Sequence, residues 1–473
     1  MITRRKLLGS SASLLALSAY GARRPNVVFV MPDQMRAQAM GCMGNPDVRT
    51  PNIDRLAGEG VLFENTLANT PVCCPARAIL MTGQYCHRNG MVANDLRLHE
   101  SRNTIAKVLR KGGYRTGFIG KWHLDGGPRL PGFVPPGPRR QGFEFWAANE
   151  CSHSHFKTQY FRDAPEPIPI NRFEPEAWTD LALEFLRAGK KDQRPFFLCV
   201  FMGPPHDPYQ APEQYARLYD PAKLTMRPNW RAQEKTPGPK EISAYYGAIT
   251  AIDDQVGRLQ KELDSLGMAE DTILLFSSDH GDMLGSHGLP LKRKPWEESI
   301  RVPGIIRYPR RVKAGRRETA LLSHIDFVPT ILSLCGAPIP GGMQGQDLSR
   351  LVLGNTRKGP DSAFFQIFGP YFGDRSPKAW RGVRTARYMY ARNTDGPWVL
   401  YDLERDPYEL NNLVGDPAAS SIQQQLDARL VDWMRRTGDS WDLNWTCPVE
   451  DNGRLYKSGT YYTVDEFLAT LKQ

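Results

Sequence analysis

The chain has 473 residues, and its 61 Lys and Arg against 51 Asp and Glu give a formal charge of +10. A hydrophobic content of 41% and a charged content of 24% are typical of a globular protein and exclude a chain without a sizeable core. The excess of basic residues suits a polyanionic partner, although an ordinary solvated basic surface explains it equally well. No basic run interleaved with aromatic residues points to nucleic acid, so we expect no nucleic-acid partner.

Residues 1–22 predict an export signal. Arg4, Arg5 and Lys6 precede a short apolar stretch, and small residues lead to Ala22. The paired arginines favour the twin-arginine route, with a Sec signal as the alternative. We therefore expect a periplasmic or secreted protein. No later stretch reaches the roughly 18 apolar residues of a spanning helix, so no membrane span is expected. The eight cysteines are scattered rather than laid out as a disulfide framework, so their pairing cannot be deduced from sequence, and one or two disulfides stay open.

The first strand is expected from Asn26, in a run of β-branched and aromatic residues that ends in Pro32, Asp33 and Gln34. Such a run is typical of a strand buried on both faces of a parallel sheet. Asp33 and Gln34 would then lie at the carboxyl end of the strand, where open α/β sheets bind ligands. A simple turn at Pro32 is the alternative interpretation.

The segment 71–83 reads PVCCPARAILMTG and combines two thiols with a guanidinium at the start of an apolar helical run. Pro75 suits the first turn of that helix. The free N–H groups of a helix start would face whatever Cys73 holds, which favours an oxyanion. Cys73 and Arg77 are therefore candidate site residues. A buried structural cysteine and a redox or metal-binding pair with Cys74 are the alternatives.

Further candidates follow two more predicted strands. Lys121 and His123 end the strand near 115–120, and because they are two residues apart they point the same way. His206 follows the strand 195–201 between prolines, which restrict it as an acid catalyst requires. Trp146, His153 and His155 lie in a polar and aromatic stretch that suits substrate contacts. A metal-like histidine pair or plain surface histidines are equally open there.

A second ligand pair, Asp279 and His280, follows the strand 272–278. Lys292 follows this pair in the sequence and is the candidate site lysine. Lys294 lies close enough to be the alternative. Alternating strand and helix patterns to about residue 334 predict an α/β fold with a large, mainly parallel sheet between helices. Short extended segments after residue 354, and a helix at 421–436, predict a small antiparallel sheet with one helix. The expected domains are 25–354 and 355–473.

Five separated motifs resemble the formylglycine-dependent sulfatases of the alkaline-phosphatase superfamily, the bacterial glycan sulfatases in particular. They are Asp33–Gln34, Cys-x-Pro-x-Arg from Cys73 to Arg77, Gly-Lys-Trp-His-Leu at 120–124, Pro-His-x-Pro around His206, and Asp279–His280 followed by Lys292. The segment 401–413 also resembles the C-terminal subdomain of that family. The resemblance implies an alkaline-phosphatase-like fold and a sulfuric ester hydrolase.

The resemblance also implies cofactors. A maturation enzyme would oxidise Cys73 to formylglycine (3-oxoalanine). The metal set would be Asp33, Gln34, Asp279, His280 and an oxygen of modified Cys73, which suits Ca²⁺ best, with Mg²⁺ and Mn²⁺ open. Gln34 and His280 depart from the commoner Asp and Asn of the family, which leaves the substrate class open.

By the same resemblance, the hydrated aldehyde attacks sulfur while the metal, Lys121, Lys292 and Arg77 neutralise the sulfate oxygens. His206, with Lys292, protonates the leaving alcohol, and His123 takes a proton so that sulfate leaves and the aldehyde returns. The expected substrate is a sulfated carbohydrate, with a 6-O-sulfated hexosamine as the specific hypothesis. A phosphonate monoester or phosphodiester hydrolase, or a non-catalytic sulfated-glycan binder with unmodified Cys73, are the alternatives.

Overall fold

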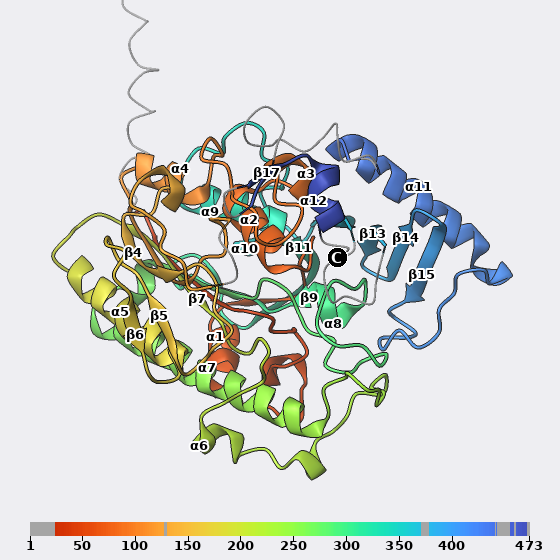
Figure 1. Cartoon of the computed structure of the whole chain (residues 1–473), viewed down its shortest axis with the longest axis horizontal. Helices are drawn as coiled ribbons and strands as arrows, with labels where there is room; N and C mark the ends of the chain where they lie inside the picture. The colour runs from red at the N-terminus through yellow and green to blue at the C-terminus, as the bar shows by residue number, and fades with distance from the viewer. Residues whose placement is uncertain are drawn as a thin grey trace, which may run out of the picture.

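A computed structural model describes residues 24–126, 130–369, 378–439, 441, 455–457 and 460–470. Its centre is a nine-stranded sheet in the order β11-β2-β10-β8-β1-β7-β3-β4, with β9 paired to β2 (Figure 1). The strands are β1 (Asn26–Pro32), β2 (Val61–Leu67), β3 (Arg115–Lys121), β4 (Phe145–Asn149), β7 (Phe196–Met202), β8 (Thr272–Ser277), β9 (Arg301–Val302), β10 (Gly304–Arg307) and β11 (Arg316–Ser323).

The middle of this sheet is parallel. β1 pairs in parallel with β7 and β8, and β3 pairs in parallel with β7 and β4. β10 is antiparallel to its neighbours β8 and β2. The sheet is therefore mixed but mainly parallel, and the predicted fold class is confirmed.

Both faces of the sheet are buried, which explains the continuous apolar run of β1. Val27, Phe29 and Met31 belong to one hydrophobic core, whereas Val28 and Val30 belong to the other. Because successive side chains of a strand point to opposite faces, a strand covered on both sides is apolar at every position. The run could thus be recognised from sequence without any alternation.

Helices cover each face. The core that holds Val28 also holds apolar residues of α1 (Pro51–Gly58), α5 (Glu174–Gly189) and α7 (Pro239–Ser265). The core that holds Val27 includes residues of α2 (Cys73–Thr82), α4 (Ile105–Lys111) and α9 (His324–Leu334). These two groups lie on opposite sides of the sheet in Figure 1. Shorter helices are α3 (Cys86–Asn89), α6 (Glu213–Ala216), α8 (Glu297–Ile300) and α10 (Ser349–Val352).

A smaller antiparallel sheet follows, as predicted. It has the order β12-β13-β14-β15, and its strands are β12 (Ser362–Ile367), β13 (Trp380–Thr385), β14 (Tyr388–Asn393) and β15 (Gly396–Asp402). Helix α11 (Ser420–Thr437) lies beside it at the right of Figure 1. Two short hairpins, β5–β6 (Thr158–Tyr160, Ile168–Ile170) and β16–β17 (Leu455–Lys457, Thr460–Tyr462), and α12 (Val464–Thr470) complete the described elements.

Three further predictions concern the export signal, a membrane span and the cysteines. The export signal at 1–22 lies outside them, so it stays a prediction. Within the described parts of the chain, no helix is both long and apolar enough to cross a bilayer. The seven cysteines described are free thiols, and Cys447 lies outside the described residues.

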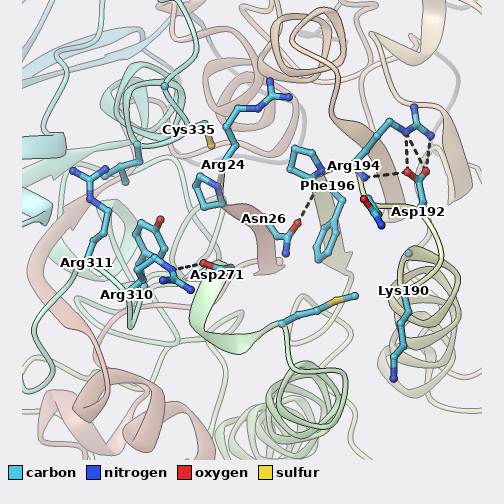
Figure 2. Close-up of a pocket in the computed structure, with 18 of the residues that line it drawn as sticks. Arg24, Asn26, Lys190, Asp192, Arg194, Phe196, Asp271, Arg310, Arg311 and Cys335 are labelled. Carbon is cyan, nitrogen blue, oxygen red and sulfur yellow. Dashed lines mark hydrogen bonds and ion pairs between the residues drawn. The ribbon is translucent and has the colours of Figure 1, made fainter. Parts of the chain in front are cut away.

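A cavity of about 1090 Å³ lies at the amino ends of β1 and β7, where Asn26 and Phe196 line it (Figure 2). Arg194 and Arg310 at its wall are each paired with an aspartate, Asp192 and Asp271. Ligand sites of open α/β sheets lie at the opposite, carboxyl ends of the strands. The residues predicted to carry the chemistry are at that other end.

Candidate active site

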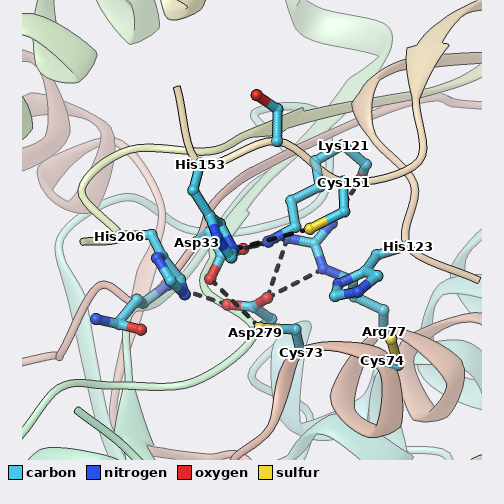
Figure 3. A network of polar contacts seen from close by, with 12 residues as sticks. Asp33, Cys73, Cys74, Arg77, Lys121, His123, Cys151, His153, His206 and Asp279 are labelled. Atoms are coloured by element: carbon cyan, nitrogen blue, oxygen red, sulfur yellow. Dashed lines mark hydrogen bonds and ion pairs between the residues drawn. The ribbon is translucent and has the colours of Figure 1, made fainter. Parts of the chain in front are cut away.

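Four adjacent parallel strands bring the predicted polar residues to one edge. In the sheet, β8, β1, β7 and β3 are neighbours and run the same way. Asp279 follows β8, Asp33 follows β1, His206 follows β7 and Lys121 ends β3. Figure 3 shows these side chains converging on Cys73. The parallel register therefore joins motifs that are far apart in the sequence.

Helix α2 carries Cys73 and Arg77 into this edge. It begins at Cys73, has Pro75 in its first turn, and ends where Gly83 adopts φ +62° and donates its N–H to the carbonyl of Ile79. All ten helical residues are buried, so the helix packs beneath the site. Its positive end faces residue 73, which favours a negative charge there.

Four side chains form a group that can hold a metal ion. One ligand atom each of Asp33, Cys73, Asp279 and His280 lies within 4.8 Å of the others, and all four residues are buried. His280 Nδ1 contacts the carbonyl of Gly281 at 3.0 Å, and Nε2 lies 3.2 Å from Cys73 Sγ. The donor set of two carboxylates and an imidazole fits a divalent cation.

Two cations hold the carboxylates in place. Arg77 donates to Asp33 Oδ2 and Asp279 Oδ2, both at 3.1 Å, and Lys121 Nζ lies 2.6 Å from Asp33 Oδ2. Burial opposes ionisation of Asp33, but Lys121, His206 and Arg77 hold the pKa of its carboxyl well below the usual range. Asp33 is therefore an anionic ligand at neutral pH. Arg77 and Lys121 contact the ligand carboxylates here, and their predicted contacts with substrate remain predictions.

Gln34 lies beside the four-residue group. Its Nε2 donates to Asp282 Oδ2 at 2.6 Å and to Asp207 Oδ1 at 3.3 Å, while its Oε1 accepts from Lys292 Nζ. The amide oxygen thus faces the cationic side of the site, and its role as a metal ligand stays a prediction. Asp282 was not singled out from the sequence, although it lies three residues after Asp279.

His206 and Lys292 form a contact pair at the other side. Lys292 Nζ lies 2.6 Å from His206 Nε2, and His206 Nδ1 lies 2.7 Å from the carbonyl of Asp207. When Nδ1 carries the ring hydrogen and donates it to that carbonyl, Nε2 can exchange a proton with Lys292 or with a bound group. The structure thus places Lys292, rather than Lys294, against His206.

His123 has a partner that the sequence did not reveal. Its Nε2 lies 3.2 Å from Asp95 Oδ1, in a loop with no recognisable motif. Burial lowers the pKa of His123, but the neighbouring Cys151 and Cys74 sulfurs and the bond with Asp95 together raise it well above the ordinary value. Asp95 thereby fixes the orientation and the proton affinity of His123.

The site favours negative charge at residue 73. Burial raises the pKa of the Cys73 thiol, but Lys292, Lys121 and His280 together bring it well below the usual value. Cys151, the second low-pKa thiol, is also buried, and His123 and Lys121 outweigh its desolvation. The surrounding cations therefore favour negative charge at both sulfurs, and the oxyanion site expected at Cys73 stays a prediction.

Trp146 is a correction to the predicted substrate residues. It is 3% exposed, and its ring contacts Phe118, Trp122 and the guanidinium of Arg140 within the hydrophobic core. From β4 the Trp146 side chain points into the hydrophobic core that covers one face of the sheet, so it does not line the site. Aromatic residues in a strand that is buried on both faces pack in the core more often than they bind ligands.

The two predicted loop histidines have different positions. His155 is buried, with Nε2 2.7 Å from the carbonyl of His206 and Nδ1 3.2 Å from Glu174, so it supports His206. His153 stacks on the His206 ring at 4.7 Å between centroids, and its Nε2 lies 3.8 Å from Cys151 Sγ. Of these two, His153 is the one in ring contact with a predicted catalytic residue.

Comparison with known proteins agrees with this geometry. The sulfatase family profile matches residues 25–337, and the C-terminal profile of N-sulphoglucosamine sulphohydrolase matches residues 285–436. The chain belongs to the sulfatase family. It is therefore a sulfuric ester hydrolase of the alkaline-phosphatase superfamily, as the resemblance implied.

Bacterial glycan sulfatases are among the relatives. The chain is 39% identical over 423 residues to the ulvan-active sulfatase of Formosa agariphila, covering 88% of this chain and 82% of the relative. It is 27% identical to the N-acetylglucosamine-6-O-sulfatase of Bacteroides thetaiotaomicron, with 88% of each chain covered. A solved structure from work on glycosaminoglycan metabolism in that organism superposes with a TM-score of 0.81 at 28% identity, covering 90% of this chain and all of the other.

Proposed function

We propose that this sulfatase hydrolyses a sulfate ester of a carbohydrate through a formylglycine made from Cys73. The observation that carries the proposal is the position of Cys73 at the positive end of α2, within 4.8 Å of the ligand atoms of Asp33, Asp279 and His280. A separate maturation enzyme must oxidise the thiol. Unlike a thiol, the hydrated aldehyde offers one hydroxyl for attack and a second for release.

A divalent metal, Ca²⁺ by preference for the oxygen-rich donor set, would supply Lewis-acid stabilisation of sulfate oxygens when bound, with Mg²⁺ and Mn²⁺ as alternatives. Asp33, Asp279 and His280, with the amide of Gln34 and residue 73, would hold it. Lys121, Lys292 and Arg77 add three positive charges around the same point. These charges bind the sulfate group and lower its repulsion of an incoming oxygen nucleophile.

Proton transfer is divided between two histidines. His206, with Lys292 against its Nε2, donates a proton to the alcohol oxygen as the sulfur–oxygen bond breaks. His123, oriented by Asp95, accepts the proton of the second hydroxyl when sulfate is expelled. We propose His153, which stacks on the His206 ring, as a residue that contacts the sugar.

The substrate class follows from chemistry and relatives together. Two relatives are named for an ulvan and for an N-acetylglucosamine 6-sulfate, and both substrates are sulfated carbohydrates. We propose a 6-O-sulfated hexosamine or a sulfated algal glycan as the two substrates to compare first. Export through the signal at 1–22 would place the enzyme in the periplasm or outside the cell, where such polymers are found.

The test starts with the peptide that spans Cys73, from protein made with its maturation enzyme. We expect its mass to be lower by about 18 Da than that of the thiol form, as the aldehyde nucleophile requires. The same protein should release sulfate from ulvan or N-acetylglucosamine 6-sulfate faster than it cleaves a phosphonate monoester or a phosphodiester. Cys73→Ser made alongside it is the matched unoxidised control.

Three results would overturn the proposal. Full activity with an unmodified thiol would exclude the formylglycine mechanism. Faster cleavage of the phosphonate monoester or phosphodiester than of any sulfate ester would assign the chain to the phosphonate alternative. Binding of sulfated glycans without turnover by the modified protein would make it a binder.

A further inference from the structure

A second group of possible metal ligands lies apart from Cys73. His287, Glu298 and Glu409 each offer one ligand atom, and these atoms lie within 4.8 Å of one another. His287 comes from the turn after β8, Glu298 from α8, and Glu409 from the segment after β15. Both glutamates are 1% exposed. The group therefore joins three segments in a buried place.

This group has more acceptors than donors. Glu298 Oε1 accepts from Arg227 Nε at 3.0 Å and from Asn229 Nδ2 at 2.8 Å, and Glu409 Oε2 accepts from the Glu297 N–H at 2.9 Å. Among the described residues, Glu298 Oε2, Glu409 Oε1 and Asn229 Oδ1 are buried oxygens without a hydrogen-bond donor. Buried acceptors in native proteins are nearly always satisfied, so three together indicate a bound ion, a water or a proton at this place.

Asn229 shows the same excess. Its single amino group faces Glu298 Oε1, His287 Nε2 at 3.2 Å and the Tyr408 carbonyl at 3.0 Å, which is one acceptor more than its two hydrogens. The His287 ring is held by stacking on Trp296 at 5.1 Å between centroids. A positive centre at this point would be surrounded by acceptors on several sides.

The ion pairs that the described residues form in this region leave one carboxylate without a cationic partner of its own. Arg384 and Arg301 pair with Glu297, and Arg227 pairs with Glu298. Across the described chain, Glu409 forms no ion pair. Burying a carboxylate without a partner is strongly unfavourable, so a positive charge is expected opposite it.

We propose that His287, Glu298 and Glu409 bind a second divalent transition-metal ion, of the Zn²⁺ class. One imidazole and two carboxylates are ligands that zinc accepts at about 2.0–2.2 Å. Tetrahedral ligands at that length lie roughly 3.4 Å apart, so the group must contract modestly on binding.

The proposed metal site lies at both ends of the segment that contains Lys292. The segment from His287 to Glu298 contains Lys292, and Glu409 belongs to the C-terminal part of the chain. An ion shared by both would tie the Lys292 segment to that part. This inference does not rest on the proposed substrate or on formylglycine, since neither enters the argument.

The test counts metal on the full chain. Metal-depleted protein is given Zn²⁺, excess ion is removed, and bound zinc per chain is measured by mass spectrometry, together with the Zn²⁺-induced shift of the melting temperature. We expect Glu409→Gln and His287→Ala each to bind one equivalent less than wild type and to lose most of the shift. Glu404→Gln, which removes an exposed glutamate nearby, should match wild type. Cys73→Ala in parallel reports the catalytic site separately.

A protonated Glu409 is the rival explanation, and the same variants exclude or establish it. Glutamine has the shape of a protonated glutamic acid, so Glu409→Gln would then keep both the melting temperature and the zinc content of wild type. That outcome overturns the proposal. Equal zinc content in wild type, Glu409→Gln and His287→Ala overturns it as well, whatever the sulfatase activity of each protein.

Discussion

At the residue scale, the position of His123 depends on Asp95. The carboxylate lies 3.2 Å from His123 Nε2, and both side chains are buried. A buried partner of this kind fixes which way an imidazole faces and raises its affinity for a proton. Asp95 therefore acts through His123 and not on the substrate.

We expect Asp95→Asn to lower kcat by about 10- to 100-fold with little change in KM, because the proton acceptor is misoriented but the sulfate-binding cations remain. Loss of the carboxylate also lowers the pKa of His123, so the acid limb of the kcat profile moves to lower pH. The measurement is the pH dependence of aryl sulfate hydrolysis. Asp163→Asn, at an exposed aspartate, serves as control. An unchanged acid limb would contradict this role.

His206 gives a second prediction at this scale, based on its contact with Lys292. General acid catalysis matters most when the leaving alcohol is a poor leaving group. We expect His206→Gln to reduce turnover of a sugar sulfate by about 10²- to 10³-fold but that of a nitrophenyl sulfate much less. The ratio of the two rates is the measurement. An equal loss on both substrates would assign His206 to binding instead.

The sequence identified the candidate site residues that belong to motifs, but not the residues that support them. Asp33, Cys73, Lys121, His206 and Asp279 each follow or start a regular element, so the pattern marks their place. Asp95 lies in an irregular loop that is brought near only by tertiary packing, so no local pattern marks it. Trp146 was predicted to contact substrate as part of a polar and aromatic loop, but it lies on strand β4 and its ring packs in the hydrophobic core.

At the scale of elements, strand β13 supports the segment that carries Lys292. Trp380 Nε1 donates to the carbonyl of Arg293 at 3.0 Å, next to the lysine. The backbone there is unusual, with φ +60° at Leu291 and φ +76° at Arg293. Non-glycine residues in this region cost energy and persist only when their surroundings hold them. The smaller sheet is thus part of the active-site scaffold.

Trp380→Phe keeps an aromatic ring but removes the indole N–H donor and the five-membered ring of a fully buried side chain. We expect it to cost about 1–3 kcal/mol of stability, because a buried carbonyl loses its partner, and to lower kcat as the Lys292 segment relaxes. Thermal unfolding and turnover on the same preparations measure both. Trp398→Phe, on strand β15 of the same sheet, is the matched control. Equal effects of the two substitutions would mean that ring packing, not the hydrogen bond, matters.

At the scale of the whole molecule, the order of the strands is what the sequence could not supply. Strand and helix patterns predicted an α/β sheet, and the C-terminal antiparallel sheet was also predicted. Nothing in the local pattern of β10 shows that it runs antiparallel between β8 and β2, since that depends on the path of the chain outside the strand. The edge of the sheet that carries the candidate site was predictable, because the carboxyl ends of parallel strands lie at the same edge whatever the order of the strands.

Glu150 links the site region to the stability of the whole fold. It is 2% exposed, and its Oε1 accepts the N–H of Asp125 at 2.7 Å. Burial, with the nearby carboxylate of Asp125, raises the pKa of Glu150 to about 8. The folded chain therefore keeps a proton that the unfolded chain releases near pH 4.5. Between about pH 4.5 and 8, the folded state binds more protons, so stability falls as pH rises.

Glu150→Gln stays neutral at every pH and should remove this part of the slope. We expect the variant to match wild type near pH 4.5 and to be more stable at pH 9, by up to about 5 kcal/mol when the difference between 4.5 and about 8 is converted at 1.4 kcal/mol per pH unit. Calorimetric melting temperatures of both proteins between pH 5 and 9 test it, with Glu144→Gln as the surface control. Parallel curves would contradict the assignment, because they would mean that the folded and unfolded chains hold the Glu150 proton alike.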